Sequence, residues 1–176
     1  MPVRAALLVI DMLNDFVKEG GALRVERAER IIPKLRELLN WARGRGLPVI
    51  YACDAHLKDV DAELALWGDH AIKGTWGAQV IEELRPQEGD YVVEKRRYSA
   101  FFATDLDLLL RELGVDTLIL TGLVTNVCVQ HTAADAYFRG YKLIIVSDCC
   151  EALTAEEHQA ALEYMRRVYG AEVKMA

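Results

Sequence analysis

The sequence predicts an α/β fold built on a parallel β-sheet, and three observations support this prediction. Five or six short apolar segments alternate with segments of helical periodicity along the 176 residues. These segments are almost continuously apolar, which is typical of parallel strands covered by helices on both faces. The chain length suits one domain with a sizeable core, so we expect a single domain over residues 1–176.

The apolar segments are the candidate strands. They are AALLVI (5–10), PVIYAC (48–53), YVVE (91–94), TLILT (117–121), KLIIVS (142–147) and the weaker AEVKM (171–175). Strand–helix–strand alternation predicts right-handed crossover connections between parallel strands. The carboxyl ends of the strands then lie at one edge of the sheet.

Four segments between the strands have helical spacing of apolar residues. They are residues 27–43, 104–113, 126–139 and 155–169. Thr104 and Thr154 are candidate N-caps, and Glu157 stands at the capping-box position after Thr154. Residues 54–76 form a long connection with little periodicity, and such loops in compact domains are more often functional than idle.

Composition and charge exclude several functional classes. Just over half of the residues are hydrophobic and 27% are charged, which is ordinary globular composition. The net charge of −6 argues against a nucleic-acid-binding protein. The N-terminal apolar run is interrupted by Asp11, is too short for a membrane span, and lacks the layout of a signal peptide. We therefore expect a cytoplasmic protein that binds neither nucleic acid nor membranes.

Polar residues follow four of the candidate strands. Asp11 follows the first strand, Asp54 the second and Lys95 the third, while the fourth ends at Thr121-Gly122 and leads to Cys128. In open parallel sheets, ligands bind beyond the carboxyl ends of the strands. Each residue alone is more often a solvated strand end or helix cap, but their coincidence favours a functional site.

The position of Cys128 differs from that of the other three cysteines. It stands at the expected start of a helix, where unpaired N–H groups and the helix dipole favour a thiolate and can bind an oxyanion. A neighbouring lysine would act in the same direction. Cys53, Cys149 and Cys150 are read as buried thiols. A cysteine, a carboxylate and a lysine suggest an amidase, with His131 read as structural.

The loop after the second strand carries a candidate metal site. Asp54 and His56 are followed by Glu63 and His70, and two imidazoles with carboxylates suit zinc, manganese or iron. A solvated polar loop is the simpler alternative. Three aromatic residues that lie near the candidate site residues in the sequence could wall a flat pocket, with ordinary packing as the alternative; they are Phe16, Trp67 and Tyr98.

Three segments resemble the isochorismatase-like cysteine hydrolases, and among them the nicotinamidases. They are LLVIDMLNDF, EKRRYSAFFATDLDLLLRELG and LTGLVTNVCVQHTAADAYFRGY. The resemblance implies a three-layer sandwich with a six-stranded parallel sheet. It also implies that Cys128 is the nucleophile and that Asp11 and Lys95 assist it.

The resemblance implies further details of the site. The Leu123–Val124 peptide bond would be cis, and the backbone N–H groups of Val124 and Cys128 would form the oxyanion hole. Asp54, His56 and His70 match the metal ligands of nicotinamidases, and Glu63 matches a fourth ligand of some members. In that family the metal, here expected to be zinc, holds the pyridine nitrogen and the aromatic residues sandwich the ring.

Three functions stay open. The first is a nicotinamidase that converts nicotinamide and water to nicotinate and ammonia, within NAD salvage. The second is a related amidase for N-carbamoylsarcosine or another small amide, because the chain has D-A-H-L where many nicotinamidases have D-W-H-P. A non-catalytic binding module is the third, and the intact Asp11, Lys95 and Cys128 argue against it. Isochorismatases proper lack the nucleophilic cysteine. Apolar helix faces are compatible with a homo-oligomer.

Overall fold

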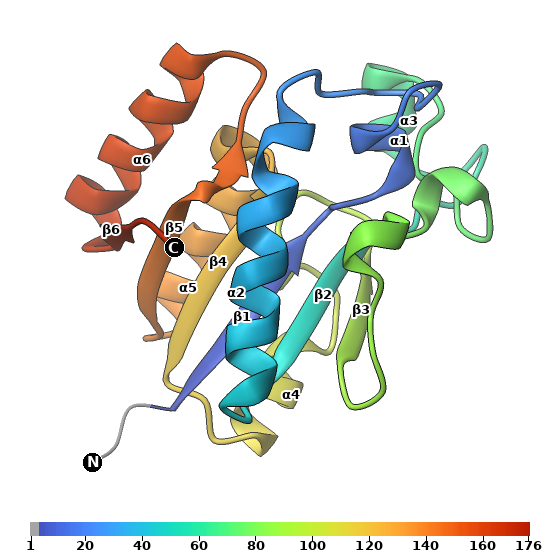
Figure 1. Cartoon of the computed structure of the whole chain (residues 1–176). Helices are drawn as coiled ribbons and strands as arrows, with labels where there is room; N and C mark the ends of the chain where they lie inside the picture. Colours follow the sequence, from blue (N-terminus) through green and yellow to red (C-terminus); the bar gives the residue numbers. More distant parts are fainter. Residues whose placement is uncertain (1–3) are drawn as a thin grey trace.

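The computed structural model describes residues 4–176, and within them six parallel strands form one sheet. The strands are β1 (Ala5–Ile10), β2 (Val49–Asp54), β3 (Tyr91–Lys95), β4 (Thr117–Leu123), β5 (Lys142–Glu151) and β6 (Glu172–Lys174). Their order in the sheet is β3-β2-β1-β4-β5-β6. The chain therefore starts in the middle of the sheet, builds one half through β2 and β3, and then crosses to the other side of β1 (Figure 1).

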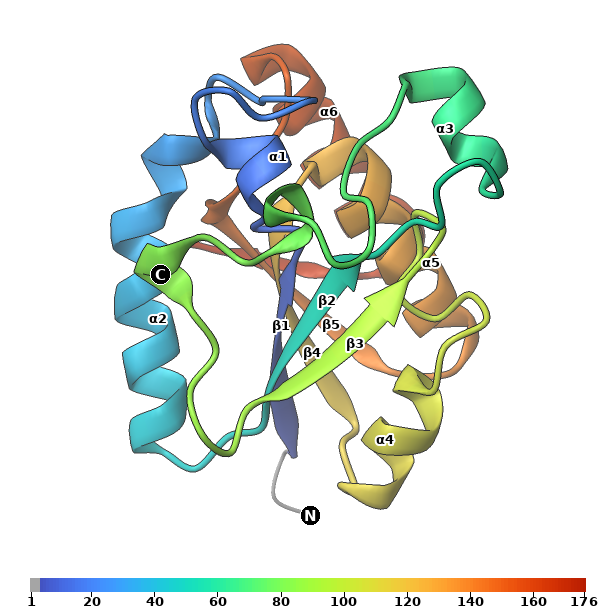
Figure 2. The same ribbon diagram turned by 90° about the vertical axis from the view of Figure 1, so that its right-hand side faces the viewer.

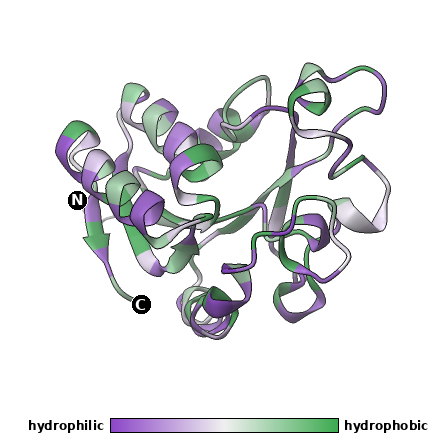
Figure 3. Cartoon of the chain, turned by 90° about the horizontal axis from the view of Figure 1, so that it is seen from above, coloured by the Kyte–Doolittle hydropathy of each residue, from purple (hydrophilic) through white to green (hydrophobic). Residues whose placement is uncertain are grey.

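Helices cover both faces of this sheet. They are α1 (Asn14–Val17), α2 (Ile32–Gly44), α3 (Ala62–Trp67), α4 (Leu106–Glu112), α5 (Gln130–Phe138) and α6 (Ala155–Tyr169). The 3₁₀ turns η1 (Ala28–Ile31), η2 (Trp76–Ala78) and η3 (Glu82–Leu84), and the π-helical turn η4 (Thr125–Val129), complete the list. Seen from above, helices that carry both hydrophilic and hydrophobic residues flank the strands (Figure 3).

Alternate side chains of β1 enter two separate hydrophobic cores. Leu8 and Ile10 pack in the cluster that includes residues of α4, α5 and α6. Leu7 and Val9 pack in the other cluster, which includes Leu35 of α2. Because strand side chains alternate between faces, β1 must be apolar at every position, and this explains the continuous hydrophobic run. The three-layer α/β sandwich with a six-stranded parallel sheet is confirmed.

The loops at the carboxyl ends of the strands gather above one edge of the sheet. Figure 2 shows α1 and α3 beyond the arrowheads of β2 and β3. Within the connection after β2, an isolated parallel bridge joins His56 to Ile72, and the N–H group of Ala55 donates to the carbonyl oxygen of Lys95 at the end of β3. The long loop predicted from the sequence therefore runs over the strand ends, where it contributes side chains to a shared site.

Several predicted boundaries differ from those of the structure. The segment 27–43 contains η1 followed by α2, and the helix after β4 begins with a π-helical turn. The predicted strand 142–147 continues to Glu151, so Cys149 and Cys150 lie within β5 and do not follow its end. The extension lies beyond an irregularity in the pairing of β4 with β5, which sequence patterns do not reveal.

Helix caps agree in one case and differ in another. Thr154 and Glu157 form the predicted capping box at the start of α6. At α4 the N-cap position is taken by Asp105, while Thr104 precedes it. Among the helices of residues 4–176, none combines the length and apolar character that a membrane crossing requires.

Candidate active site

The carboxyl ends of three strands bring an acid, a base and a thiol together. Lys95 Nζ, at the end of β3, lies 2.8 Å from Asp11 Oδ2 and 3.4 Å from Cys128 Sγ. A carboxylate oxygen of Asp11 and the Cys128 sulfur lie within 4.8 Å of each other. All three residues are buried. Residues predicted from three separate parts of the sequence thus meet at one point.

A close approach of β1 to β4 sets the position of Asp11. This residue follows β1 with a φ of 52°, in a region that aspartate enters more readily than most residues. Gly122 pairs with Ile10 and has a φ of 108°. A Cβ atom at Gly122 would lie 2.0 Å from the Ile10 carbonyl oxygen. Glycine is therefore required where the segments that carry Asp11 and Cys128 come together.

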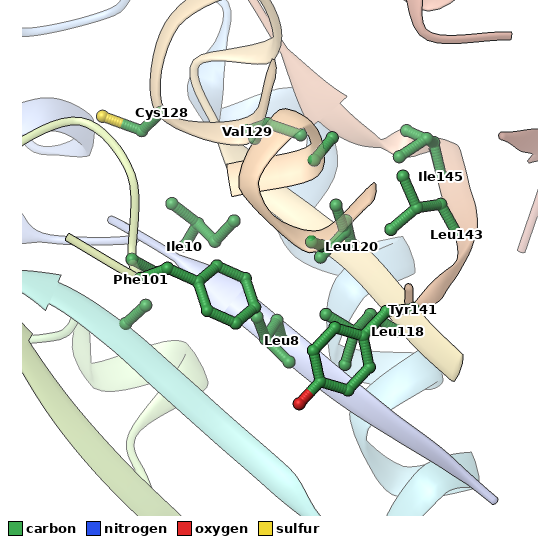
Figure 4. Close-up of a cluster of buried hydrophobic side chains, with 14 of the residues drawn as sticks. Leu8, Ile10, Phe101, Leu118, Leu120, Cys128, Val129, Tyr141, Leu143 and Ile145 are labelled. Atoms are coloured by element: carbon green, nitrogen blue, oxygen red, sulfur yellow. The ribbon is translucent and has the colours of Figure 1, made fainter. Parts of the chain in front are cut away.

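Cys128 lies in the π-helical turn η4, immediately before α5. π-helical turns are rare and often occur at functional sites. Its neighbour Val129 is fully buried in the core. The Cys128 side chain, in contrast, extends away from the labelled apolar residues (Figure 4). The turn therefore anchors the helix start while presenting the sulfur to the strand ends.

Burial dominates the acid–base properties of this cluster. Burial, followed by the negative charge of Asp54, raises the pKa of Asp11 to about 6. Burial also raises the pKa of the Cys128 thiol well above its usual value, although Lys95 acts in the opposite direction. The charge of Lys95 lowers the pKa values of both Cys128 and Asp11, as expected, but burial and the neighbouring carboxylates outweigh it. In the resting protein Cys128 is a thiol beside a carboxylate that titrates close to neutrality.

Asp54 connects this cluster to a second one. Its Oδ1 atom accepts a hydrogen bond from Lys95 Nζ at 2.6 Å, and its Oδ2 atom lies 3.6 Å from His56 Nε2. Burial alone would lower the pKa of Lys95, but the carboxylates of Asp11 and Asp54 outweigh it and raise that pKa well above its usual value. Lys95 is consequently a permanent cation within the cluster.

The second cluster contains the four predicted metal ligands. Asp54, His56, Glu63 and His70 each offer a ligand atom, and these four atoms all lie within 4.8 Å of one another. All four residues are buried. His56 Nε2 is 3.3 Å from Glu63 Oε2, and the imidazole of His70 lies edge-on to that of His56. The sequence-predicted donor set is thus brought together at one point.

The hydrogen-bonding pattern leaves ligand atoms of these residues free to bind a cation. His56 Nε2 and Glu63 Oε1 are buried without a hydrogen-bond partner. His70 Nδ1 is 2.8 Å from the carbonyl oxygen of Gly68, to which it donates, and this leaves Nε2 as the lone-pair nitrogen. Orphaned buried polar atoms are rare, and two imidazoles with two carboxylates suit zinc, manganese or iron. The residues therefore fit a divalent metal ion.

A cavity of about 330 Å³ opens onto both clusters. Its walls include Asp11 and Cys128 from the first cluster and Asp54, Glu63 and His70 from the second. The three predicted aromatic residues also line it; they are Phe16, Trp67 and Tyr98. Trp67 Nε1 donates to the Tyr98 hydroxyl group at 3.0 Å. The cavity is therefore bordered by the thiol, by three of the four predicted metal ligands and by the three aromatic residues.

The backbone around Val124 also borders this cavity. The Leu123–Val124 peptide bond is cis, as the resemblance implied. Val124 and Cys128, whose N–H groups were predicted to bind an oxyanion, both line the cavity. His131 lies outside it, with Nδ1 2.7 Å from the carbonyl oxygen of Val127, which agrees with its structural reading.

Two carboxylates that no sequence motif indicates support the site from outside the cavity. Asp61 is buried and contacts the His56 imidazole, Leu57 N–H and Arg96. Asp15 holds two loops, because its carboxylate accepts from the N–H groups of Ala22 and Ala71. These carboxylates lie in segments without clear periodicity, and only the tertiary contacts distinguish them from ordinary surface acids.

The fold and these clusters define a three-layer α/β protein with a buried thiol–carboxylate–ammonium group at the carboxyl ends of its strands. A family model for the isochorismatase domain matches residues 5–174. The chain therefore belongs to the isochorismatase family.

Among curated relatives, the isochorismatase family protein YaaI of Bacillus subtilis is 34% identical, with 96% of this chain and 92% of the relative covered. The ureidoacrylate amidohydrolase RutB of Klebsiella pneumoniae is also 34% identical, covering 96% of this chain and 83% of the relative.

Several solved structures of amidases are also similar to this chain. The chain is similar to N-carbamoylsarcosine amidase from Thermoplasma acidophilum (TM-score 0.91, 43% identity, 98% and 96% of the two chains covered). It is also similar to the nicotinamidase PncA from Bacillus subtilis (0.93, 37%, 98% and 99%). A third similar structure is the pyrazinamidase of Pyrococcus horikoshii in complex with zinc (0.90, 29%, 98% and 99%).

Proposed function

We propose that this chain is a metal-containing cysteine amidohydrolase whose substrate is nicotinamide. The observation that carries the proposal is the cavity shared by the Cys128 thiol and three members of the Asp54–His56–Glu63–His70 group, namely Asp54, Glu63 and His70. Such an arrangement can hold a ring at one end and cleave its amide at the other. The similarity to nicotinamidases and to a zinc-containing pyrazinamidase supports the same substrate class.

Asp11 and Cys128 carry the first half of the reaction. Asp11 takes the thiol proton, and the sulfur attacks the amide carbonyl carbon, whose π electrons move to oxygen. The N–H groups of Val124 and Cys128 stabilise the resulting oxyanion. When the tetrahedral intermediate collapses, Asp11 returns the proton to the leaving nitrogen. Ammonia departs, and the acyl group remains attached to Cys128 as a thioester.

The second half releases the acid. Asp11, now ionised again, takes a proton from a water molecule that attacks the thioester carbonyl carbon. Collapse of the second tetrahedral intermediate breaks the carbon–sulfur bond, and Asp11 protonates the departing sulfur. Lys95 stays protonated and stabilises the negative charge that moves between Asp11 and Cys128. A pKa of about 6 suits Asp11 to both proton transfers near neutral pH.

Asp54, His56, Glu63 and His70 would hold the metal ion, for which zinc is the first choice and manganese or iron are alternatives. When bound, the metal supplies a Lewis-acidic position for the pyridine nitrogen. The chain itself orients the ring through Phe16, Trp67 and Tyr98, which line the cavity.

Nicotinamide and benzamide provide a direct test, because they differ only in the ring nitrogen. The proposal predicts ammonia release from nicotinamide with kcat/KM far above that for benzamide. His56→Ala should remove most of this preference, since the nitrogen then lacks its partner. Equal activity on the two amides in the wild-type protein, or an unchanged preference in His56→Ala, would contradict the assignment.

A second candidate is a hydrolase of small N-carbamoyl acids. The similarity to N-carbamoylsarcosine amidase and to RutB favours it, and so does Arg24, which lines the cavity and could pair with a substrate carboxylate. Ammonia release from N-carbamoylsarcosine but not from nicotinamide would identify this activity. Arg24→Met should then raise the KM for N-carbamoylsarcosine strongly; if uncharged nicotinamide is the substrate instead, the same substitution should change its KM little.

A further inference from the structure

Asp61 has an unusual orientation for its place in the fold. It stands at the N-cap of α3, where an aspartate side chain normally accepts a hydrogen bond from the first turn of the helix. Here it makes no capping hydrogen bond. Its side chain is fully buried and turned towards the metal-binding group. Contacts outside helix α3 must therefore hold the Asp61 side chain in this orientation.

Those contacts involve donors to both oxygens of the carboxylate. Asp61 Oδ2 lies 3.0 Å from His56 Nδ1 and 3.1 Å from the N–H group of Leu57. Asp61 Oδ1 accepts from Arg96 Nε at 2.9 Å, and Arg96 Nη2 pairs with the same oxygen. Arg96 has only donors and directly follows Lys95 in the chain. Each of these three partners therefore presents a hydrogen to this carboxylate.

This arrangement determines which nitrogen of His56 faces the metal-binding group. Because Asp61 accepts from Nδ1–H, the lone pair of the neutral ring is on Nε2, the atom that faces Asp54 and Glu63 and lacks a hydrogen-bond partner. A carboxylate behind a histidine ligand fixes the tautomer and ring orientation, and its loss typically costs 10–100-fold in metal affinity.

We infer that Asp61, oriented by Arg96, is a positioning residue that presents His56 Nε2 to a divalent metal ion. This inference rests on the metal site of the proposed function. It also connects that site to the end of β3, because Arg96, which hydrogen-bonds to Asp61, is the residue after Lys95.

The test compares binding of Zn²⁺ and of Co²⁺ to the purified, metal-free protein. The Zn²⁺ dissociation constant comes from competition with a chromophoric chelator, and the visible absorption of bound Co²⁺ reports the ligand geometry. Asp61→Asn should weaken Zn²⁺ binding about 10–100-fold. The donors of Arg96 attract the amide oxygen, so the amide NH₂ group turns to His56 Nδ1 and shifts the ring proton to Nε2.

A double variant makes this explanation specific. In Asp61→Asn with Arg96→Met, the amide is free to turn its oxygen towards His56 Nδ1. The double variant should therefore bind Zn²⁺ more tightly than Asp61→Asn alone, although Arg96→Met alone weakens binding. A merely structural role for the pair would predict that the double variant is as weak as Asp61→Asn or weaker, and that result would overturn the inference.

The controls separate this inference from the proposed function. Lys73→Met removes the exposed Lys73–Glu94 ion pair near the same strand and should leave Zn²⁺ binding unchanged. If the wild-type protein binds neither metal, both the metal site and the inference fall. If wild type and Asp61→Asn bind Zn²⁺ equally well, only the role of Asp61 falls. If Asp61→Asn does not fold, Arg96→Met and Arg96→Lys still test the inference, because Arg96 is half-exposed and can be replaced without disturbing the core. Arg96→Met should weaken Zn²⁺ binding more than Arg96→Lys.

Discussion

At the scale of single residues, burial outweighs the local charges. Lys95 lies within 3.4 Å of the Cys128 sulfur, yet the pKa of the thiol is raised because the sulfur is buried beside two carboxylates. Asp11 is the group that titrates near neutrality. In the proposed mechanism, activation of Cys128 therefore depends on transfer of its proton to Asp11 and less on a thiolate that exists before substrate binds.

Cys128 is predicted to be the only cysteine required for turnover. Cys128→Ala should abolish amide hydrolysis, because no other thiol lines the cavity within residues 4–176. Cys149→Ala and Cys150→Ala remove buried atoms from β5 and should lower thermal stability without changing kcat. Ammonia-release kinetics and thermal melts measure the two effects. Full activity in Cys128→Ala would exclude the thioester mechanism.

Asp11 and Lys95 should shift the pH dependence of Cys128 alkylation in opposite directions. Asp11→Asn removes a negative charge that raises the thiol pKa, so the iodoacetamide reaction should extend to lower pH. Lys95→Met removes the opposing positive charge and should move it to higher pH. Hydrolysis should nevertheless fall about 10²–10⁴-fold in Asp11→Asn, because the proton acceptor is gone. Identical alkylation profiles in both variants would mean that neither charge acts on the sulfur.

The pH–rate profile should report Asp11 in the wild-type protein. A carboxylate with a pKa raised to about 6 is protonated, and hence inactive as a base, below that pH. We expect kcat/KM to fall as the pH drops through about 6. An unperturbed aspartate would instead place this fall near pH 4. A flat profile between pH 5 and 7 would show that another group accepts the thiol proton.

At the scale of elements, the junction of β1 and β4 positions the site. Gly122→Ala should destabilise the protein by more than about 1 kcal/mol, since the residue has a positive φ and the new Cβ would meet the Ile10 carbonyl group. The displacement of the backbone that relieves this clash should also move Asp11 relative to Cys128. Denaturant unfolding and kcat measure the two consequences. Gly20→Ala, at a glycine with a similar positive φ but open space around it, is the matched control.

At the scale of the whole molecule, the metal-binding group joins the loop after β2 to the sheet. A ligand that binds only the folded state stabilises it, by about 2.7 kcal/mol at a concentration 100 times its dissociation constant. For a chain of this size we expect Zn²⁺ at that ratio to raise Tm by roughly 5–10 °C. His56→Ala should remove the shift. A shift that persists in His56→Ala would place the metal elsewhere.

The sequence alone was sufficient to predict the alternation of strands and helices, and hence the parallel sheet. Those features follow from local patterns: continuous apolar runs, helical spacing and glycines after helices. It also identified the strand-end residues Asp11, Lys95 and Cys128, because parallel strands place their carboxyl ends at one edge whatever the details of packing. Their roles in catalysis remain predictions.

Only the tertiary structure decided how these residues act on one another. The direction of the pKa shift at Cys128 depends on burial, which no local pattern encodes. The extension of β5 through Cys149 and Cys150 depends on its pairing with β4. Asp61 acquires its place behind His56 through contacts with a loop and with Arg96, 35 residues away. Local sequence determines the elements, whereas charges and hydrogen bonds in a buried site depend on neighbours that are distant in the chain.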